Sequence, residues 1–360
     1  MAKKLYIPGP TQVSPDMLAA MAQPMIGHRT KEYAALHKDV VERLRWLLNT
    51  RERVFLSTSS SFGIMEGAVR NLVGKRCVNF ANGAFSKKWH DVTLRCGKEA
   101  DIVEVEWGKP ITPELVDKAL ATGKYDAMTL IHNETSTGVM SPLAEIAEVM
   151  QRYPDVSFIL DTVSSMSAVP LDLDALKTDV CIAGVQKAFA LPPGLAICAV
   201  SERALAKAAT IPGRGYYFDF VEFAKSDEKD NTPSTPCVSQ IFALQQQLMK
   251  MASEGLEKRY QRHREMAEAT HNWALSKGFT LFPEPGSYSM TLTCIRNDDR
   301  TDLDALKKLA GEHGYAIDNG YGKIKNKTFR IAHMGDYTVK DMQELFDLLD
   351  ELLPAVRTSA

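Results

Sequence analysis

Hydrophobic positions along the chain follow two patterns, short apolar runs and longer stretches with helical spacing. Apolar runs predict seven strands, at 53–58, 77–81, 102–106, 127–132, 157–160, 180–183 and 195–200. Helical periodicity fills much of the chain between them, for example over 64–73, 86–96, 113–121 and 142–152. Strands that alternate with helices are typical of a mostly parallel sheet with helices on both faces. The pattern therefore predicts an α/β fold on a seven-stranded sheet.

The two ends of the chain follow other patterns. Residues 5–30 look irregular except for a short helix near 15–22, which Ser14 could cap and Pro15 could start, and a longer helix follows over 31–49. A long helical stretch over 238–277, broken near 253–255, leads into a small α+β unit. We expect three parts: an N-terminal segment over 1–15, a large domain over 16–255 and a small C-terminal domain over 256–360.

The small unit contains two predicted strands and two predicted helices. The strands lie at 288–295 and 328–333. The helices begin at Thr301 and at Thr338. Each of these threonines is followed three residues later by an aspartate, which resembles a capping box.

Composition excludes several classes of protein. The 360 residues are 45% hydrophobic and 24% charged, as in an ordinary soluble globular protein. The net charge of −2 and the lack of a dense basic run argue against nucleic-acid binding. No signal-peptide pattern and no run long enough to cross a bilayer is evident. The six cysteines lack metal-ligand spacing, so we expect reduced thiols, no metal site and a cytoplasmic protein.

One lysine stands where a predicted strand meets a loop. The apolar segment 179–184 leads directly into Gln186-Lys187 and then into Pro192-Pro193-Gly194. A lysine in this position lies at an edge of the sheet, where ligands usually bind. Its apolar neighbours favour the neutral amine, a nucleophile that forms an imine with an aldehyde. The alternative is an exposed lysine in a connecting loop.

A second stretch, 26 residues upstream of Lys187, favours the chemical interpretation. The apolar strand over 157–160 ends in Asp161, which hydroxyl residues follow. If both strands belong to one parallel sheet, Asp161 and Lys187 project from the same edge. Pyridoxal phosphate (PLP) enzymes need this pair, because the lysine holds the cofactor's aldehyde and the acid partners its pyridinium nitrogen. Alone, such an aspartate is more often a turn residue or helix cap.

Short motifs in a fixed order run through nearly the whole chain. They are Pro8-Gly9-Pro10-Thr11, Gly27-His28-Arg29, Asn133–Gly138, Asp161–Ser164, Gln186-Lys187-Ala188, Pro192-Pro193-Gly194 and Phe329-Arg330-Ile331. With this set the chain resembles the class V aminotransferases of PLP fold type I, in particular the alanine/serine–glyoxylate (or pyruvate) branch. The resemblance implies PLP as cofactor, a seven-stranded large domain with a small α+β domain, and a homodimer with active sites at the subunit interface.

The resemblance also implies roles for individual residues. Those that match phosphate contacts are Ser60, Ser61, Phe62, Gln186 and, delivered by a neighbouring subunit, Thr235. Phe85 matches the aromatic residue that stacks on the pyridine ring, and Val163 covers the opposite face. Thr135 matches the residue that hydrogen-bonds the cofactor's phenolic oxygen. Without this context, a serine-rich helix cap at 58–63 and a core phenylalanine would be the simpler interpretations.

Arg330 is the candidate for substrate binding. It lies in a predominantly apolar predicted strand, where a guanidinium is costly without an anionic partner. A carboxylate bound by two parallel hydrogen bonds is the natural partner. By resemblance, Arg330 binds the α-carboxylate of the amino acid, and Gly27 and His28 also belong to the substrate site. A structural salt bridge is the competing account.

We therefore expect a PLP-dependent aminotransferase. It would exchange an amino group between serine or alanine and a 2-oxo acid, glyoxylate or pyruvate, with ping-pong kinetics. Lys187 would hold the cofactor as an imine and then carry the α-proton as general base and acid.

Three other interpretations stay open. A phosphoserine aminotransferase that uses 2-oxoglutarate would need a second cationic cluster, with candidates His28, Arg29, Lys87, Lys88, Arg214 and His333. A cysteine desulfurase or related lyase would need a mobile, exposed cysteine, for which Cys294 is the candidate in the small unit. A non-enzymatic protein on the same fold is the third, since fold does not fix function.

Overall fold

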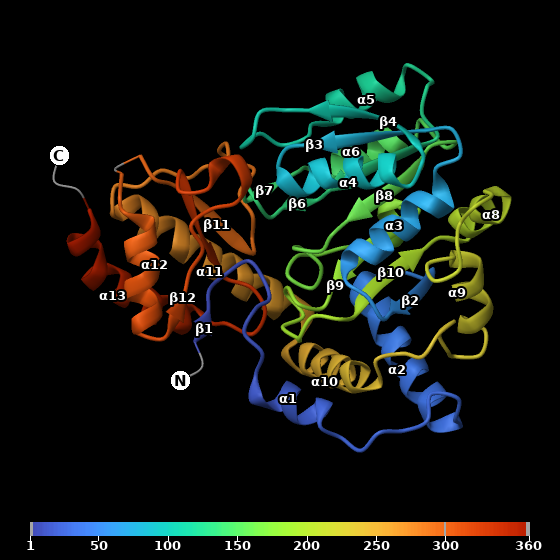
Figure 1. Ribbon diagram of the computed structural model, residues 1–360, viewed down its shortest axis with the longest axis horizontal. Coiled ribbons are helices and arrows are strands. Elements are labelled where there is room, and N and C mark those ends of the chain that lie inside the picture. Colours follow the sequence, from blue (N-terminus) through green and yellow to red (C-terminus); the bar gives the residue numbers. More distant parts are fainter. Residues whose placement is uncertain (1–2, 299, 358–360) are drawn as a thin grey trace.

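The computed structural model describes residues 3–298 and 300–357 of the chain. Residues 1–2 of the predicted N-terminal segment, and residues 299 and 358–360 of the predicted C-terminal domain, lie outside the described residues. Figure 1 shows a larger part built around one sheet and a smaller part, at the left, that contains the C-terminal helix.

One sheet of seven strands organises the larger part. In spatial order its strands are β2 (Arg53–Ser57), β10 (Ala196–Val200), β9 (Val180–Gly184), β8 (Ser157–Asp161), β5 (Ala127–Ile131), β3 (Arg76–Ala81) and β4 (Glu99–Glu104). Neighbours are parallel except at β10, which runs antiparallel to both β2 and β9. The predicted mostly parallel, seven-stranded α/β sheet is therefore confirmed. The predicted bounds are least accurate at β4, which begins at Glu99 rather than at residue 102.

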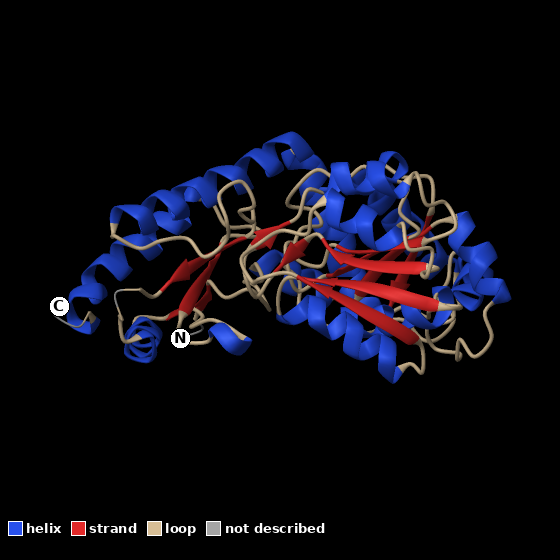
Figure 2. Ribbon diagram, turned by 90° about the horizontal axis from the view of Figure 1, so that it is seen from above, coloured by secondary structure: helices blue, strands red, loops and turns tan. Residues whose placement is uncertain are grey.

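Helices cover both faces of this sheet (Figure 2). Successive strand residues point to opposite faces, and in β8 Phe158 and Leu160 belong to one core while Ile159 belongs to the other. The helices that close the core around Ile159 are α3 (Ser61–Leu72), α4 (Ala84–Arg95), α8 (Glu202–Thr210) and α9 (Phe220–Asp227). Those that close the opposite core are α1 (Pro15–Met21), α2 (Lys31–Leu48), α5 (Pro113–Leu120), α6 (Leu143–Met150), α7 (Leu173–Leu176) and α10 (Val238–Glu254). Burial on both faces explains why the strands are continuous apolar runs.

The smaller part is an α+β unit. Its elements are α11 (Leu256–Ser276), β11 (Leu292–Arg296), α12 (Leu303–Glu312), β12 (Tyr315–Ala316), the 3-10 helix η1 (Gly322–Ile324), β13 (Thr328–Ala332) and α13 (Val339–Val356). As predicted, a break separates α10 from α11, at Gly255 with φ of +84°. The N-terminal strand β1 (Lys4–Leu5) pairs in parallel with β12, and Tyr6 enters the core of the smaller part. The N-terminal segment therefore connects the two parts before α1 packs on α10 (Figure 1).

The predicted helix caps have mixed outcomes. Thr338 and Asp341 form the expected capping box at the start of α13. The box predicted at Thr301 is wrong, because α12 starts at Leu303 and the Asp302 carboxylate accepts from the Ala305 N–H at 3.0 Å. Ser14 occupies the N-cap position of α1, but its side chain makes no cap hydrogen bond.

Within the described ranges, no helix has both the length and the apolar character that a membrane span requires.

Candidate active site

Several predicted site residues meet at one edge of the main sheet. The carboxyl ends of β8 and β9 are neighbours, with Asp161 in register with Ile182, and Lys187 follows β9 by three residues. Because β2 and β9 are both antiparallel to β10, they are parallel to each other. Ser61, which begins α3 after β2, therefore reaches the same edge. Ligands of open α/β sheets bind at this edge.

Lys187 lies in the connection between β9 and β10, and its backbone is fixed from two sides. The Thr11 hydroxyl of the N-terminal segment donates to the Lys187 carbonyl at 2.9 Å. The buried Arg259 guanidinium of α11 donates to the Ala188 carbonyl at 2.6 Å. The Lys187 side chain turns toward the N-terminal segment, where its Nζ donates to the Pro8 carbonyl. Lys187 is thus held between the two parts of the molecule.

The surroundings of Lys187 favour its neutral amine, as the sequence predicted. Burial lowers the pKa of Lys187 to about 8, and the positive charge of Arg330 acts in the same direction. The carboxylates of Asp161, Asp318 and Glu134 oppose this shift without cancelling it. Near pH 8 about half of the Lys187 side chains are therefore uncharged and nucleophilic, whereas an ordinary lysine is almost fully protonated there.

Asp161 is a buried carboxylate with both oxygens occupied. Its Oδ1 accepts from the Val163 N–H and its Oδ2 from the Trp89 indole N–H, each at 2.9 Å. Burial raises the pKa of Asp161 to about 6, and these two hydrogen bonds and the charge of Lys187 limit the rise. Asp161 is therefore mostly ionised at neutral pH, as an acid that partners a pyridinium nitrogen must be. Val163 is half-buried beside it.

The start of α3 fits the phosphate group that the resemblance implies. The Ser61 hydroxyl is buried and has no hydrogen-bond partner among the described residues. It lies beside Gln186 over Gly184, where an added Cβ would overlap the Ser61 Oγ and come within 2.5 Å of the Gln186 Oε1. The first N–H groups of a helix are free and carry a partial positive charge, which favours an anion. Ser60 and Phe62 flank Ser61 and are exposed.

Phe85 stands at the start of α4. Its ring is half-buried and stacks on that of Tyr321, with ring centroids 5.1 Å apart and 15° between the planes. The buried carboxylate of Glu134 accepts from the Phe85 N–H at 3.3 Å and the Ser86 N–H at 2.7 Å, and so caps the helix. Gly83 is required for this cap, since a Cβ there would overlap the Glu134 side chain. That Phe85 stacks on a pyridine ring stays a prediction.

Arg330 is buried on β13 and already has an anionic partner. Its Nε donates to the Asp318 Oδ1 at 2.9 Å, and its Nη2 lies 2.7 Å from the same oxygen. Its Nη1 donates to the carbonyl of Thr135 at 2.9 Å, and the Thr135 hydroxyl lies 2.5 Å from that of Ser164. The competing structural salt bridge therefore exists. These contacts use three of the five guanidinium N–H groups, which leaves two for another anion, so the substrate role stays a prediction.

Three predicted site residues have no described contact with Lys187 within the single chain. Gly27 and Thr235 are exposed, and the His28 carbonyl accepts from the Asn231 side chain at 3.1 Å. Among the residues that the structure describes, no hydrogen bond or ion pair connects these three to Lys187. Their predicted roles are untested by a single chain.

Comparison with known proteins decides the family. Residues 11–322 match the family described as aminotransferase class-V. The chain belongs to this family. Membership makes it a PLP-dependent transaminase, and the buried Ser61 hydroxyl without a partner, its close approach to Gly184 and Gln186, and the Lys187–Asp161 pair fit that cofactor.

Relatives of this aminotransferase match it over nearly its whole length. An uncharacterized aminotransferase of Methanocaldococcus jannaschii is 37% identical over 341 residues, which cover 92% of this chain and 88% of that protein. The serine–glyoxylate aminotransferase of Methylorubrum extorquens is 32% identical over 347 residues, covering 92% and 86%. The crystal structure of an alanine–glyoxylate aminotransferase from Nostoc sp. is 26% identical, with a TM-score of 0.93 and coverage of 98% and 96%.

The structure weakens the case for a phosphate-bearing substrate of this aminotransferase. Lys87 pairs with Glu104 at 2.9 Å, and Arg214 pairs with Asp219 at 3.0 Å. His333 is fully buried, and burial lowers its pKa to about 3, so it is neutral. Three of the six cationic candidates are thereby neutralised by carboxylates or uncharged.

Cys294 does not suit a desulfurase. It lies within β11 and is 1% exposed, whereas that chemistry needs a mobile and accessible thiol. Burial also raises the pKa of Cys294 to about 12, which disfavours the reactive thiolate.

Four residues of the site escaped prediction from the sequence. Trp89 carried a signal, because it follows Phe85 by four residues and so lies on the same face of the predicted helix. Glu134 lay within a quoted motif but received no role. Asp318 and Tyr321 carried no local signal, since they reach the site only through the fold of the smaller part.

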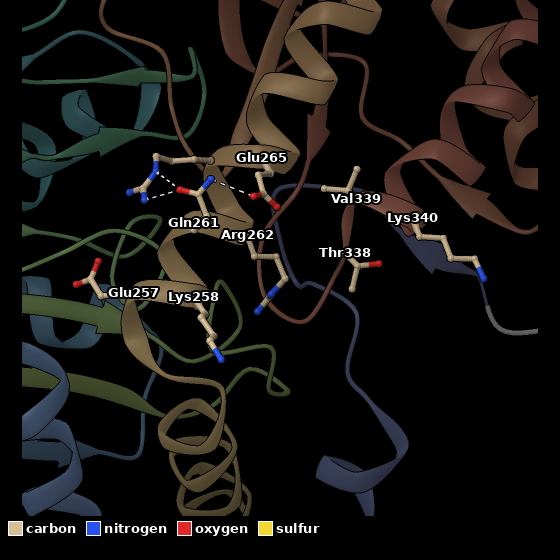
Figure 3. Close-up of a pocket in the computed structure, with 9 residues that line it drawn as sticks. Glu257, Lys258, Gln261, Arg262, Glu265, Thr338, Val339 and Lys340 are labelled. Atoms are coloured by element: carbon tan, nitrogen blue, oxygen red, sulfur yellow. Dashed lines mark hydrogen bonds between the residues drawn. The ribbon is translucent and has the colours of Figure 1, made fainter.

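A separate open groove lies between α11 and the start of α13 (Figure 3). Several of its polar groups are paired: Gln261 accepts from Arg264 at 2.7 Å and donates to Glu265 at 3.0 Å. Arg262 pairs with Glu254 at 2.6 Å. None of the predicted site residues lines this groove, so it is distinct from the candidate active site.

Proposed function

We propose that this aminotransferase transfers the amino group of serine or alanine to glyoxylate or pyruvate, with ping-pong kinetics and with Lys187 as the residue that holds PLP. The bound cofactor supplies an aldehyde that takes up the amino group and a ring that accepts electrons. The observation that supports this most is the position of Lys187 and Asp161 at the ends of adjacent strands, with opposite shifts of their pKa values. The named activities of the relatives support the substrate pair.

Each role follows from the contacts of the residue. Lys187 Nζ is neutral in about half the molecules near pH 8, so it can accept the α-proton of the substrate and return it. Asp161 is held ionised to stabilise a proton on the ring nitrogen. Arg330 would bind the α-carboxylate with its two remaining N–H groups, while Asp318 fixes its orientation. Ser61 and Gln186 would hold the phosphate.

A homodimer belongs to this proposal. Thr235 is exposed in the single chain, as a residue that serves a neighbouring subunit's site must be. The six cysteines are all free, which suits the reducing environment of the cytoplasm that we propose as the location.

The donor is tested by a spectrophotometric screen. The PLP-loaded protein is mixed with serine, alanine, aspartate or phosphoserine, and the conversion of bound aldehyde to the amine form is followed. We expect serine and alanine to convert it, glyoxylate or pyruvate to reverse the change, and double-reciprocal plots to be parallel. Phosphoserine should leave the spectrum unchanged. Conversion by phosphoserine alone, reversed by 2-oxoglutarate, would contradict the proposed substrates.

The phosphate site is tested at Gly184. In Gly184→Ala the methyl group would occupy the space between the Ser61 hydroxyl and Gln186, so we expect PLP to bind on the order of tenfold more weakly, a loss of about 1.4 kcal/mol. Gly311→Ala is the matched control, because its methyl group meets only the end of the flexible Lys3 side chain. Equilibrium dialysis measures the dissociation constant of PLP for both variants. Unchanged affinity in Gly184→Ala would place the phosphate elsewhere.

A further inference from the structure

The Trp89 indole makes a contact that has no role in the proposed transamination. Trp89 lies on α4 and is 1% exposed. Its Nε1 donates to the Oδ2 of Asp161 at 2.9 Å, and Asp161 is itself 5% exposed. The fold enforces the contact, since Asp161 and Ile159 lie on the same face of β8 and Ile159 shares a core with Trp89.

An indole restricts the state of the carboxylate it contacts. The Trp89 Nε1 is a donor only, so it cannot accept a hydrogen bond from a protonated Asp161. A hydrogen bond donated to the charged form of an acid favours that form. The second oxygen of Asp161 faces the Val163 N–H, which is also a donor. Both contacts therefore select the ionised carboxylate and fix its plane.

We propose that Trp89 is a positioning residue, which orients the Asp161 carboxylate and keeps it ionised, so that the proton shared with bound PLP resides on the ring nitrogen. This inference rests on the proposed function. Without the indole N–H, Asp161 would compete better for that proton, and the ring would accept electrons less well.

The other groups around Asp161 do not replace this contact. The carboxylate of Glu134 raises the pKa of Asp161, and the ammonium form of Lys187 lowers it. The Cys181 thiol of β9 is neutral, because burial raises its pKa to about 12. These groups act on Asp161 through their charge or not at all, whereas the Trp89 indole and the Val163 N–H are its hydrogen-bond donors.

The chain offers a matched control for the indole. In the smaller part, Trp273 Nε1 donates to the Asp350 Oδ1 at 2.9 Å, the distance found at Trp89. Trp273 is 7% exposed and stacks on Phe346, in a core that contains none of the predicted site residues. Trp273→Phe therefore removes the same kind of hydrogen bond without touching the active site.

The test measures PLP binding as a function of pH in the wild type, Trp89→Phe and Trp273→Phe. PLP binding should weaken on the acid side as Asp161 becomes protonated. The acid limb is the pH range in which PLP affinity falls as pH decreases. In Trp89→Phe we expect this range to lie about one pH unit higher than in the wild type, so that within it PLP binds about tenfold more weakly. We expect kcat to fall about tenfold with KM changed less than twofold. Trp273→Phe should match the wild type in the acid limb, kcat and KM.

Each alternative outcome has a defined meaning. An acid limb that is unchanged in Trp89→Phe, or that moves equally in both variants, would overturn the proposal. If Trp89→Phe fails to fold, β-(3-benzothienyl)alanine incorporated at position 89 keeps the shape of the indole and lacks its N–H, and the same shift is expected. Failure of the proposed function is separate, because the wild type would then not bind PLP at Lys187 at all.

Discussion

Replacing Lys187 by alanine is expected to lower the rate of transamination by at least about 10³- to 10⁴-fold. The substitution removes both the amine that we propose to hold the cofactor and the group that we propose to move the α-proton. The effect should exceed that of any other single substitution in the site, since no second lysine contributes to the site around Asp161 in the described chain. Single-turnover rates with serine or alanine give the measurement.

The attachment point can be mapped directly. Borohydride reduction of the PLP-loaded protein followed by peptide mapping should place the cofactor on the peptide that contains Lys187. Lys118→Ala is the control, because Lys118 is exposed on α5, a helix on the opposite face of the sheet from α4, and should leave the rate unchanged. Reduced cofactor on another lysine, or full activity in Lys187→Ala, would contradict the assignment.

Periodicity was sufficient to predict the larger part of the fold, because its strands are buried on both faces. Such strands are short uninterrupted apolar runs, and all seven could be recognised. The antiparallel direction of β10 could not be predicted from apolar pattern, since it depends on the path of the chain around Lys187. The pairing of β1 with β12 could not be predicted either, because a strand of two residues is too short to show an alternating pattern.

Site residues could be predicted where a polar side chain with a known chemical role stands at the end of an apolar strand. Lys187 and Asp161 are polar residues at the ends of apolar strands, so both could be identified and placed at one edge. The residues that contact and orient the site side chains could not be predicted from their places in the sequence. Asp318 reaches Arg330 from the segment that follows β12, and the orientation of the Trp89 indole depends on how α4 packs on the main sheet.

The second large effect is expected at Asp161. In Asp161→Asn the side chain keeps its shape but loses the charge that favours a protonated ring nitrogen, so kcat should fall on the order of 10²- to 10³-fold. The loss should exceed that in Trp89→Phe, because the substitution removes the carboxylate rather than one of its donors. Equal rates in Asp161→Asn and the wild type would show that this acid does not partner the ring.

Stability without cofactor tests the same carboxylate independently of catalysis. The folded pKa of Asp161 is about 6, above the value near 3.8 expected for the unfolded chain, so ionisation destabilises the fold as pH rises between these values. From pH 4 to pH 7 the free energy of unfolding of Asp161→Asn should therefore gain about 2 kcal/mol relative to the wild type.

The Asp336→Asn variant is the control of opposite sign. Burial alone would raise the pKa of Asp336, but the hydrogen bond from Lys250 and the charge of Arg259 outweigh it and hold the pKa below its usual range. The ionised form of Asp336 therefore stabilises the fold, and that contribution is lost as pH falls through the folded pKa. Relative to the wild type, Asp336→Asn should lose stability as pH rises from the acid range, whereas Asp161→Asn gains it. Urea titrations of the apoproteins measure both slopes, between pH 4 and pH 7 for Asp161→Asn and below pH 4 for Asp336→Asn. A common sign would mean that Asp161 is ionised without penalty, and burial would then not raise its pKa.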